Sequence, residues 1–107
     1  MMWKYEEGRI YSTDDDGRLM AEANYSRKNQ KEVDIEHVYV DPNLRGQGIA
    51  GQTMTVVAEY LRENGLKATA SCSYANTWLQ KNEDHYSDVI AKGMENQAAA
   101  CRVDSKH

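Results

Sequence analysis

Three glycines in the stretch LRGQGIAGQ, residues 44–52, could let a phosphate group approach the backbone closely. Gly46, Gly48 and Gly51 match G-x-G-x-x-G, the pattern of dinucleotide-binding loops. In that fold the first glycine directly follows a strand, and an acidic residue about 20 residues further on binds the ribose. Here the residues DPNLR separate the expected strand from Gly46, no acidic residue ends the next expected strand, and too little chain follows for the second half of such a fold. The sequence therefore argues against a dinucleotide site.

A more general anion site is the remaining interpretation of this loop. It lacks the lysine that a P-loop requires. A helix is expected to begin inside the loop, and the first N–H groups of a helix have no partner within it. These groups and the helix dipole favour a negative ligand such as a pyrophosphate, and an arginine adds positive charge. The expected pyrophosphate-binding residues are Arg45, Gly46, Gln47, Gly48, Ile49 and Ala50.

The strand expected before the loop is VDIEHVYV, residues 33–40, because it alternates with period two and is rich in β-branched side chains. This alternation places on one face the side chains of Val33, Ile35, His37 and Tyr39. The opposite face changes from acidic at Glu36 to apolar at Val38, as at a strand that borders a wet cleft at one end. The change marks a candidate site.

Helical and strand periods alternate after the loop. Apolar residues recur at helical spacing from Ala50 to Leu61, and Gly65 suits a left-handed helix end. The stretch LKATASCSY, residues 66–74, predicts a strand of small side chains. The stretch ANTWLQKNEDHYSDVIAKG predicts one helix, or two short ones separated near residues 82–84, with Trp78 packed in the core like Tyr60 of the preceding helix.

Two β-prone runs near the N-terminus, RIYS and RLMAEANYS, flank the turn sequence TDDDG and predict a hairpin. The order of elements predicts an α/β fold with a mixed sheet. An antiparallel N-terminal meander is followed by one parallel βαβ unit and C-terminal helices. We expect a single domain over residues 1–95 and a frayed tail over residues 96–107.

Composition narrows the classes of function. A chain of 107 residues suits one domain, and its net charge of -4 without a Lys/Arg stripe argues against nucleic-acid binding. No apolar run reaches the roughly 18 residues of a membrane span. Without a signal peptide or paired cysteines, a cytoplasmic protein with Cys72 and Cys101 as free thiols is expected. His85, His107 and Cys101 lack metal-ligand spacing, so no metal is expected.

Two segments, EHVYVDPNLRGQGIAGQ and ATASCSYANTWLQKN, resemble the core of the GNAT N-acetyltransferase superfamily. Residues 45–50 match its R-G-x-G-x-A loop, and the resemblance runs from about Gly8 to Gly93. More narrowly, the chain resembles a small single-domain GNAT-like branch with a Cys on the strand after the loop. The resemblance implies a GNAT-like fold and acetyl-CoA, or coenzyme A (CoA), as cosubstrate.

The resemblance also implies positions for the pantetheine arm of the coenzyme. In GNAT proteins the strand before the loop carries a bulge whose backbone amide polarises the thioester carbonyl. Carried over, the main chain of Val38, Tyr39 and Val40 lines the arm, and Asn76 lies near the arm or the acetyl group. The usual acid, a Tyr eight residues after this Asn, is replaced here by Asp84. Tyr86, two residues further on, is expected to pack in the core, so the acid stays open.

Three residues are candidates for the chemistry. Glu36 and His37 lie on the strand as possible bases, and His37 is preferred because imidazole titrates nearest neutrality. The alternative is a histidine that only packs in the strand. Cys72 could lie beside His37 on a neighbouring strand and act as an acid or acyl acceptor. The alternative is that this thiol is a small buried hydrophobe.

The leading hypothesis is an acetyl-CoA-dependent N-acetyltransferase. It would transfer an acetyl group to an amine, either a small molecule or a Lys side chain, by direct attack in a ternary complex. One alternative is a CoA or acyl-CoA binding protein without turnover, because so short a domain lacks the elements that usually build an acceptor pocket. Another is a thiol-dependent acyl carrier that uses Cys72. We expect a monomer or a weak homodimer.

Overall fold

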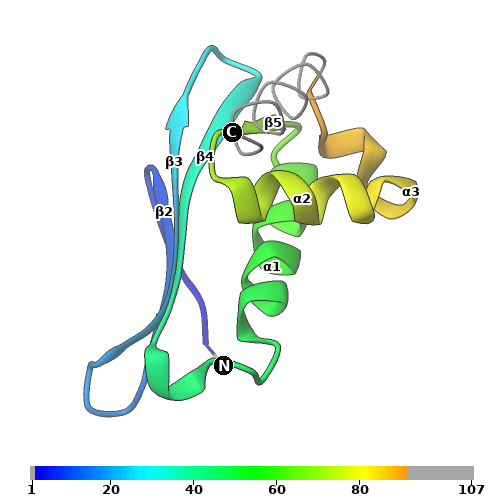
Figure 1. Cartoon of the computed structure of the whole chain (residues 1–107). Helices are drawn as coiled ribbons and strands as arrows, with labels where there is room; N and C mark the ends of the chain where they lie inside the picture. Colours follow the sequence, from blue (N-terminus) through cyan, green and yellow to red (C-terminus); the bar gives the residue numbers. More distant parts are fainter. Residues whose placement is uncertain (1, 92–107) are drawn as a thin grey trace.

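The computed structural model describes residues 2–91, which form a five-stranded sheet with its helices on one face (Figure 1). The strands lie in chain order: β1 (Lys4–Glu6), β2 (Arg9–Thr13), β3 (Leu19–Arg27), β4 (Glu32–Val40) and β5 (Lys67–Ala70). The first four pair antiparallel, and β4 pairs with β5 in parallel. The mixed sheet, with a meander followed by one βαβ unit, is confirmed.

The connection from β4 to β5 contains a short 3-10 helix and the longest α-helix. These are η1 (Pro42–Leu44) and α1 (Ile49–Glu63), and the chain continues into α2 (Ser73–Lys81), α3 (Glu83–Tyr86) and η2 (Ser87–Val89). After α1, Gly65 adopts a φ of 66° and the N–H of Leu66 donates to the carbonyl of Leu61, which confirms the left-handed helix end. The predicted separation of two helices is found at Asn82.

The core lies between the sheet and the helices. The largest fully buried side chains include Ile10 and Ile35 from the sheet, Met54 and Leu61 from α1, and Leu79 from α2. Around this centre, Trp78 and Tyr60 are partly buried and Tyr86 is buried. The packing role predicted for these three aromatic residues is confirmed.

β4 contains one extra residue, so the predicted alternation does not hold along the whole strand. Asn24 pairs with His37 and the next residue, Tyr25, pairs with Ile35, so Glu36 is a β-bulge. Directly opposite residues of an antiparallel pair share a face. Because Val38 and Val40 face the buried Ala23 and Ala21, they lie on the core side with Ile35.

The prediction that His37 and Tyr39 share a face with Val33 and Ile35 is therefore wrong. They pair with Asn24 and Glu22 and lie on the face of the sheet that α1 and α2 do not cover. A bulge adds one residue to one strand, which reverses the phase of every later side chain.

The strand expected over residues 66–74 is shorter than predicted. It ends at Ala70, which pairs with Ile35 directly before the bulge. A bulge bends its strand, so the parallel neighbour separates from β4 at this point. Cys72 consequently caps the start of α2, and Tyr74 lies within that helix.

Two elements, β1 and η1, were not predicted from the sequence. The predicted domain end at residue 95, the frayed tail and the roles of Cys101 and His107 fall outside the described residues. Among residues 2–91, no helix has the length and apolar character needed to cross a membrane.

Candidate functional site

The loop between η1 and α1 adopts the conformation of an anion site. Gly46 and Gly48 have φ values of 86° and 78°, the left-handed region that favours glycine. Gly48 precedes α1 as its N-terminal cap, and the N–H of Gln52 donates to the Gly48 carbonyl at 3.1 Å. The N–H groups of Ile49, Ala50 and Gly51 therefore come before the first hydrogen bond within the helix and have no acceptor there.

The third glycine of the loop behaves differently from the other two. Gly51 has an ordinary helical conformation, and a Cβ added there would meet only the Trp78 side chain, at 3.9 Å. A dinucleotide fold uses its third glycine for close packing of helix on strand. Neither backbone conformation nor packing requires glycine at this position, which supports the view that the G-x-G-x-x-G spelling is coincidental.

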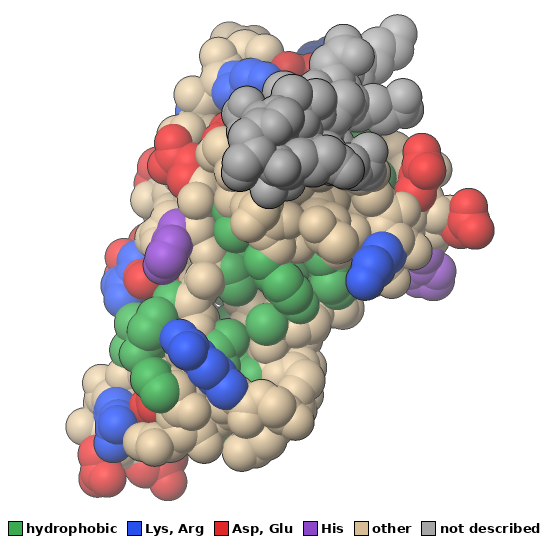
Figure 2. Space-filling model, viewed as in Figure 1, with side chains coloured by type: hydrophobic (Ala, Val, Ile, Leu, Met, Phe, Trp, Pro, Cys, Tyr) green, Lys and Arg blue, Asp and Glu red, His purple; other side chains and the backbone are tan. Residues whose placement is uncertain are grey.

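A cavity of about 160 Å³ connects the loop with the ends of two other elements. Its walls come from the last residue of β4, the loop, the first turn of α1 and the first turn of α2: Val40, Leu44, Arg45, Gly46, Gly48, Ile49, Ala50, Gly51 and Tyr74. Figure 2 shows hydrophobic side chains gathered in the hollow between the sheet and the helices. Part of the predicted phosphate loop thus lines a partly apolar cavity.

The edge of β4 beside this hollow has no neighbouring strand beyond the bulge. Pairing with β5 ends at Ile35, while pairing with β3 continues to Val40. The N–H of Cys72 donates to the Ile35 carbonyl at 3.1 Å, and the chain then turns into α2. Residues 36–40 consequently present one edge of their main chain to the gap between β4 and α2.

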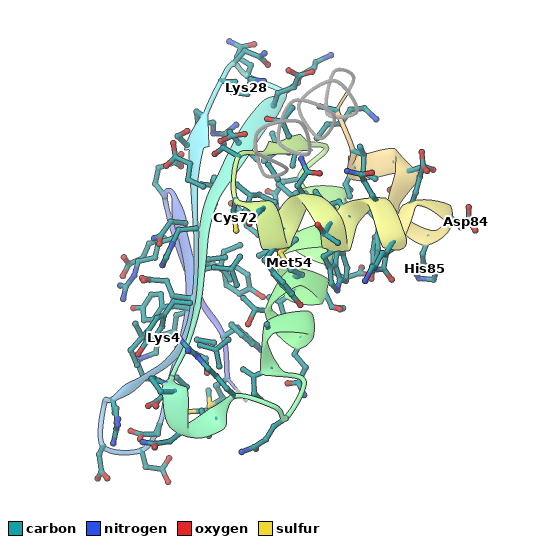
Figure 3. The ribbon with its side chains drawn as sticks, in the orientation of Figure 1. Lys4, Lys28, Met54, Cys72, Asp84 and His85 are labelled. Carbon is teal, nitrogen blue, oxygen red and sulfur yellow. The ribbon has the colours of Figure 1, made fainter. Side chains whose placement is uncertain are left out.

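Cys72 and His37 lie near the bulge on different faces of the sheet, because Cys72 packs against the core and His37 lies on the uncovered face. Glu36 and His37 are exposed, and Glu36 accepts a hydrogen bond from the Ser26 hydroxyl at 3.0 Å. Cys72 is half-buried, and its backbone is bonded to the residue that precedes Glu36. Figure 3 shows Cys72 at the start of α2 beside β4, at the opposite end of the helical segment from His85.

Asn76 lies beneath this gap with its amide group already bonded. It is 4% exposed, its Nδ2 donates to the Ala70 carbonyl at 3.0 Å, and its Oδ1 accepts from Gln80. These bonds tie the end of β5 to the start of α2. In this structure the amide supports the wall of the gap, and its predicted contact with the pantetheine arm stays a prediction.

Tyr74 is a cavity residue that the sequence reasoning missed. Its side chain is 42% exposed, and it lines the cavity together with Val40 and Arg45. Burial, and to a smaller extent the nearby Cys72, raises the pKa of the Tyr74 phenol, so the group is protonated at neutral pH. The alternation of SCSY resembles a strand, which concealed its position at the first turn of a helix.

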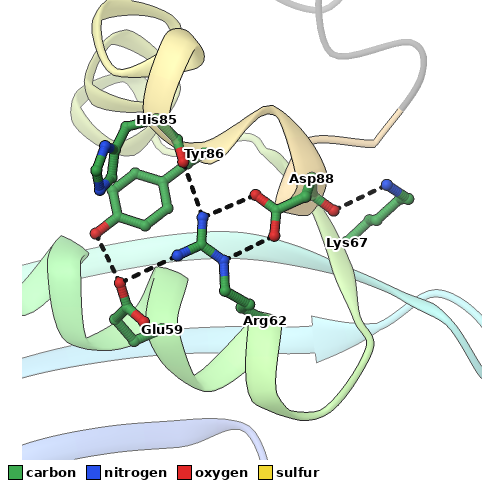
Figure 4. A network of polar contacts seen from close by, with 6 residues as sticks. All are labelled: Glu59, Arg62, Lys67, His85, Tyr86 and Asp88. Atoms are coloured by element: carbon green, nitrogen blue, oxygen red, sulfur yellow. Dashed lines mark hydrogen bonds and ion pairs between the residues drawn. The ribbon is translucent and has the colours of Figure 1, made fainter.

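A polar network fixes the segment that follows α2 onto α1 (Figure 4). Arg62 donates to both carboxylate oxygens of Asp88, at 2.7 and 2.9 Å, and to the His85 carbonyl at 2.8 Å. The guanidinium lowers the pKa of Asp88 below its ordinary value. Tyr86 donates to Glu59 at 3.0 Å, and burial raises the pKa of this phenol. Tyr86 is thus part of the structural network, away from the cavity lining.

Residues 2–91 contain no group of three or more His, Cys, Asp or Glu side chains placed to hold a metal ion.

Comparison with known proteins decides the family. A family model described as GCN5-related N-acetyl-transferase matches residues 9–89. The chain belongs to the GCN5-related N-acetyltransferase family. The solution structure of a GCN5-like protein from Staphylococcus aureus is similar, with a TM-score of 0.68 and 37% identity over 84% of this chain and 87% of that chain.

Two other relatives match shorter parts of this chain. Protein NATD1 from Xenopus tropicalis is 31% identical over 58 residues, 54% of this chain, and the match spans 53% of that protein. The GNAT family N-acetyltransferase YhbS from Escherichia coli, solved in complex with CoA, has a TM-score of 0.52 and 25% identity. That likeness covers 58% of this chain and 38% of YhbS.

Proposed function

We propose that this chain is an acetyl-CoA-dependent N-acetyltransferase that acts on an amine. The observation that carries the proposal is the unpaired edge of β4 after the bulge, beside a helix-initiating loop with left-handed glycines. An extended ligand with an anionic end suits this combination. It can bond to strand main chain at one end and to helix N–H groups at the other.

The coenzyme would lie along two parts of the site. Residues 45–50 would bind its pyrophosphate, because Arg45 adds charge to the free N–H groups at the start of α1. The main chain of Val38, Tyr39 and Val40 would face the pantetheine arm. Family membership, together with the likeness to a CoA-bound relative, supports this assignment.

The bulge and its neighbours would carry the proton transfers. When bound, the coenzyme supplies a thioester whose carbonyl carbon an amine can attack. His37, or Glu36 beside it, would take a proton from the acceptor amine as its nitrogen bonds to that carbon. The carbon–sulfur bond would then break, and Cys72 would return a proton to the leaving sulfur. The free main-chain edge next to the bulge would stabilise the developing oxyanion.

Thiol release tests the proposal directly. The purified full chain is mixed with acetyl-CoA and a panel of polyamines, amino acids and lysine peptides, and free thiol is followed over time. CoA binding is measured in parallel by calorimetry. We expect thiol release that depends on an amine and on His37. Binding without release for every amine would instead support a CoA-binding protein without turnover.

A second candidate function, a thiol-dependent acyl carrier, rests on the position of Cys72. Cys72 is half-buried and precedes the first residue of α2, and its N–H is bonded to the residue before the bulge. In this function the Cys72 sulfur bonds to the acetyl carbon, the carbon–sulfur bond of the coenzyme breaks, and CoA leaves with the proton of the thiol.

Intact-mass measurement separates the carrier from direct transfer. After exposure to acetyl-CoA without an amine, a carrier gains one acetyl group, and the Cys72→Ser variant does not. If the wild-type mass stays unmodified while amine-dependent thiol release continues, the carrier function is excluded and direct transfer stands.

A further inference from the structure

A buried carboxylate stands between β4 and η1. Asp41 is 5% exposed, and its side chain accepts hydrogen bonds from the Asn43 N–H at 2.9 Å and from Arg18 at 3.0 Å. Its main chain is bonded as well. The N–H donates to the Met20 carbonyl at 2.9 Å, and the carbonyl accepts from the Leu44 N–H at 2.8 Å. Asp41 therefore joins the start of β3, the end of β4 and η1.

The residues on both sides of this junction line the cavity of the candidate site. Val40 comes directly before Asp41, and Leu44 and Arg45 come at the end of η1. A 3-10 helix of one turn has few hydrogen bonds of its own. The last of them here, from the Arg45 N–H to the Pro42 carbonyl, is long at 3.4 Å. The bond to the Asp41 carboxylate at the start of η1 therefore helps to fix where this turn places the residues that follow it.

Charge does not explain an aspartate at this position. Residues 45–50 are the proposed pyrophosphate site, and a carboxylate in the segment that leads into it repels an anion. The ion pair with Arg18 offsets this charge, and Figure 1 shows the connection between β2 and β3 beside η1 at one end of the sheet. The Arg18 side chain is 62% exposed, and ion pairs with so exposed a partner contribute little. The hydrogen bond that caps η1 is the feature of Asp41 that serves the loop.

We infer that Asp41 is a positioning residue for the coenzyme loop. Its carboxylate caps η1, η1 places Leu44 and Arg45 at the cavity wall, and Arg45 begins the loop that would bind the pyrophosphate. Without the cap, a smaller fraction of molecules holds the loop in its binding arrangement, and the apparent Kd rises as this fraction falls. This inference rests on the proposed function and adds a residue outside the loop to the binding of the coenzyme.

Two conservative substitutions separate the cap from the charge. Asp41→Asn keeps an oxygen for the Asn43 N–H and removes the charge. Asp41→Glu keeps the charge, but its longer side chain does not close the same short bond. Calorimetry on the full chain should show the Kd of CoA raised about fivefold or more in Asp41→Glu, and within about twofold of wild type in Asp41→Asn, because asparagine caps as well as aspartate. Asp41→Ala replaces Asp41→Glu if the longer side chain prevents folding.

An acetyl donor without a pyrophosphate distinguishes positioning from damage to the fold. S-acetylpantetheine carries the thioester and the pantetheine arm alone. In Asp41→Glu, kcat/KM with acetyl-CoA should fall about fivefold or more, through KM, while kcat with acetyl-CoA and kcat/KM with S-acetylpantetheine stay within about twofold of wild type. A general loss of structure would lower the activity with both donors.

The matched control is Asn29→Ala, in the connection between β3 and β4. The Asn29 side chain accepts from the Lys31 N–H at 2.8 Å, which is the same bond to the residue two positions further on. Its loss removes an equivalent turn bond away from the loop. Asn29→Ala should change neither the Kd of CoA nor kcat/KM with either donor.

The other results overturn the inference in distinguishable ways. An unchanged Kd of CoA in folded Asp41→Glu, or an equal loss of activity with both donors, removes the positioning role and leaves the acetyltransferase function standing. An equal rise of Kd in Asp41→Asn assigns the effect to charge and also removes the role of the cap. CoA binding without turnover of any amine removes the proposed function, while the Kd values of the variants still decide the role of Asp41. No CoA binding by the wild-type protein removes both.

Discussion

The phosphate loop can be tested with one substitution and a control of equal backbone strain. Gly48 and Gly17 have φ values of 78° and 85°, and an added Cβ at either position meets no heavy atom within 4 Å. Glutamate at either position therefore costs a similar amount of backbone strain, about 1–2 kcal/mol. Only Gly48 lines the cavity at the start of α1, whereas Gly17 lies between β2 and β3.

The expected loss of affinity follows from the added charge. A carboxylate about 4 Å from one phosphate charge is repelled by ~1 kcal/mol in water and ~4 kcal/mol at an effective dielectric constant of 20. Since 1.4 kcal/mol is a factor of ten, Gly48→Glu should raise the Kd of CoA by about fivefold to several hundredfold. Gly17→Glu should leave this Kd within about twofold of the wild-type value.

Calorimetry at low ionic strength measures both Kd values. Urea unfolding of both variants checks that the two substitutions lower the free energy of unfolding by a similar amount. Raising the salt concentration should reduce the difference between the variants, because exposed charges are screened. Equal Kd values for Gly48→Glu and the wild-type protein, with both folded, would refute the placement of the pyrophosphate at this loop.

Three further predictions concern the base, the polar network and the core. His37→Gln should lower kcat about 100-fold or more in the thiol-release assay without changing CoA affinity, because a general base contributes at least that factor; an unchanged kcat would contradict the role. Asp88 has a pKa held below 3.8 by Arg62, so its stabilising effect is present above that value and is lost as pH falls through the lowered pKa. The free energy of unfolding in urea should therefore fall less for Asp88→Asn than for the wild-type protein between pH 5 and about pH 2. An identical fall would be evidence against this ion pair. Leu79 is fully buried, so Leu79→Ala should lower the free energy of unfolding by about 2–5 kcal/mol, whereas Lys81→Ala on the same helix should stay within about 0.5 kcal/mol.

The central unit of the fold could be predicted because its periodicities are strong. The helical spacing of apolar residues from Ala50 to Leu61 predicts α1, and Gly65 follows the end of this helix as expected. The bulge that the family resemblance implies for this strand is found at Glu36, and it also leaves a signal in the sequence. The apolar residues Val33 and Ile35 are out of phase with Val38 and Val40. One inserted residue, Glu36, accounts for this change of phase. Periodicity alone does not distinguish a bulge from a strand whose environment changes.

Elements that depend on tertiary contacts could not be predicted. β1 has three exposed residues and is defined by its pairing with β2. The strand at residues 66–74 was predicted too long because alternating small residues fit a strand and a helix start equally well. Its end is determined by the bend of β4, which lies more than 30 positions away in the chain. The position of Tyr74 in the cavity depends on the same bend of β4.

The central claim is that the α1 loop and the free edge of β4 together bind acetyl-CoA. Titration of the isotope-labelled full chain with CoA, followed by backbone amide NMR, tests it most directly. We predict large, saturable shifts at Gly46, Gly48 and Ile49 in the loop and at Val38 and Val40 in the strand, with little change in β1 and β2. Saturable shifts confined to the meander, or no shifts at millimolar CoA, would contradict it.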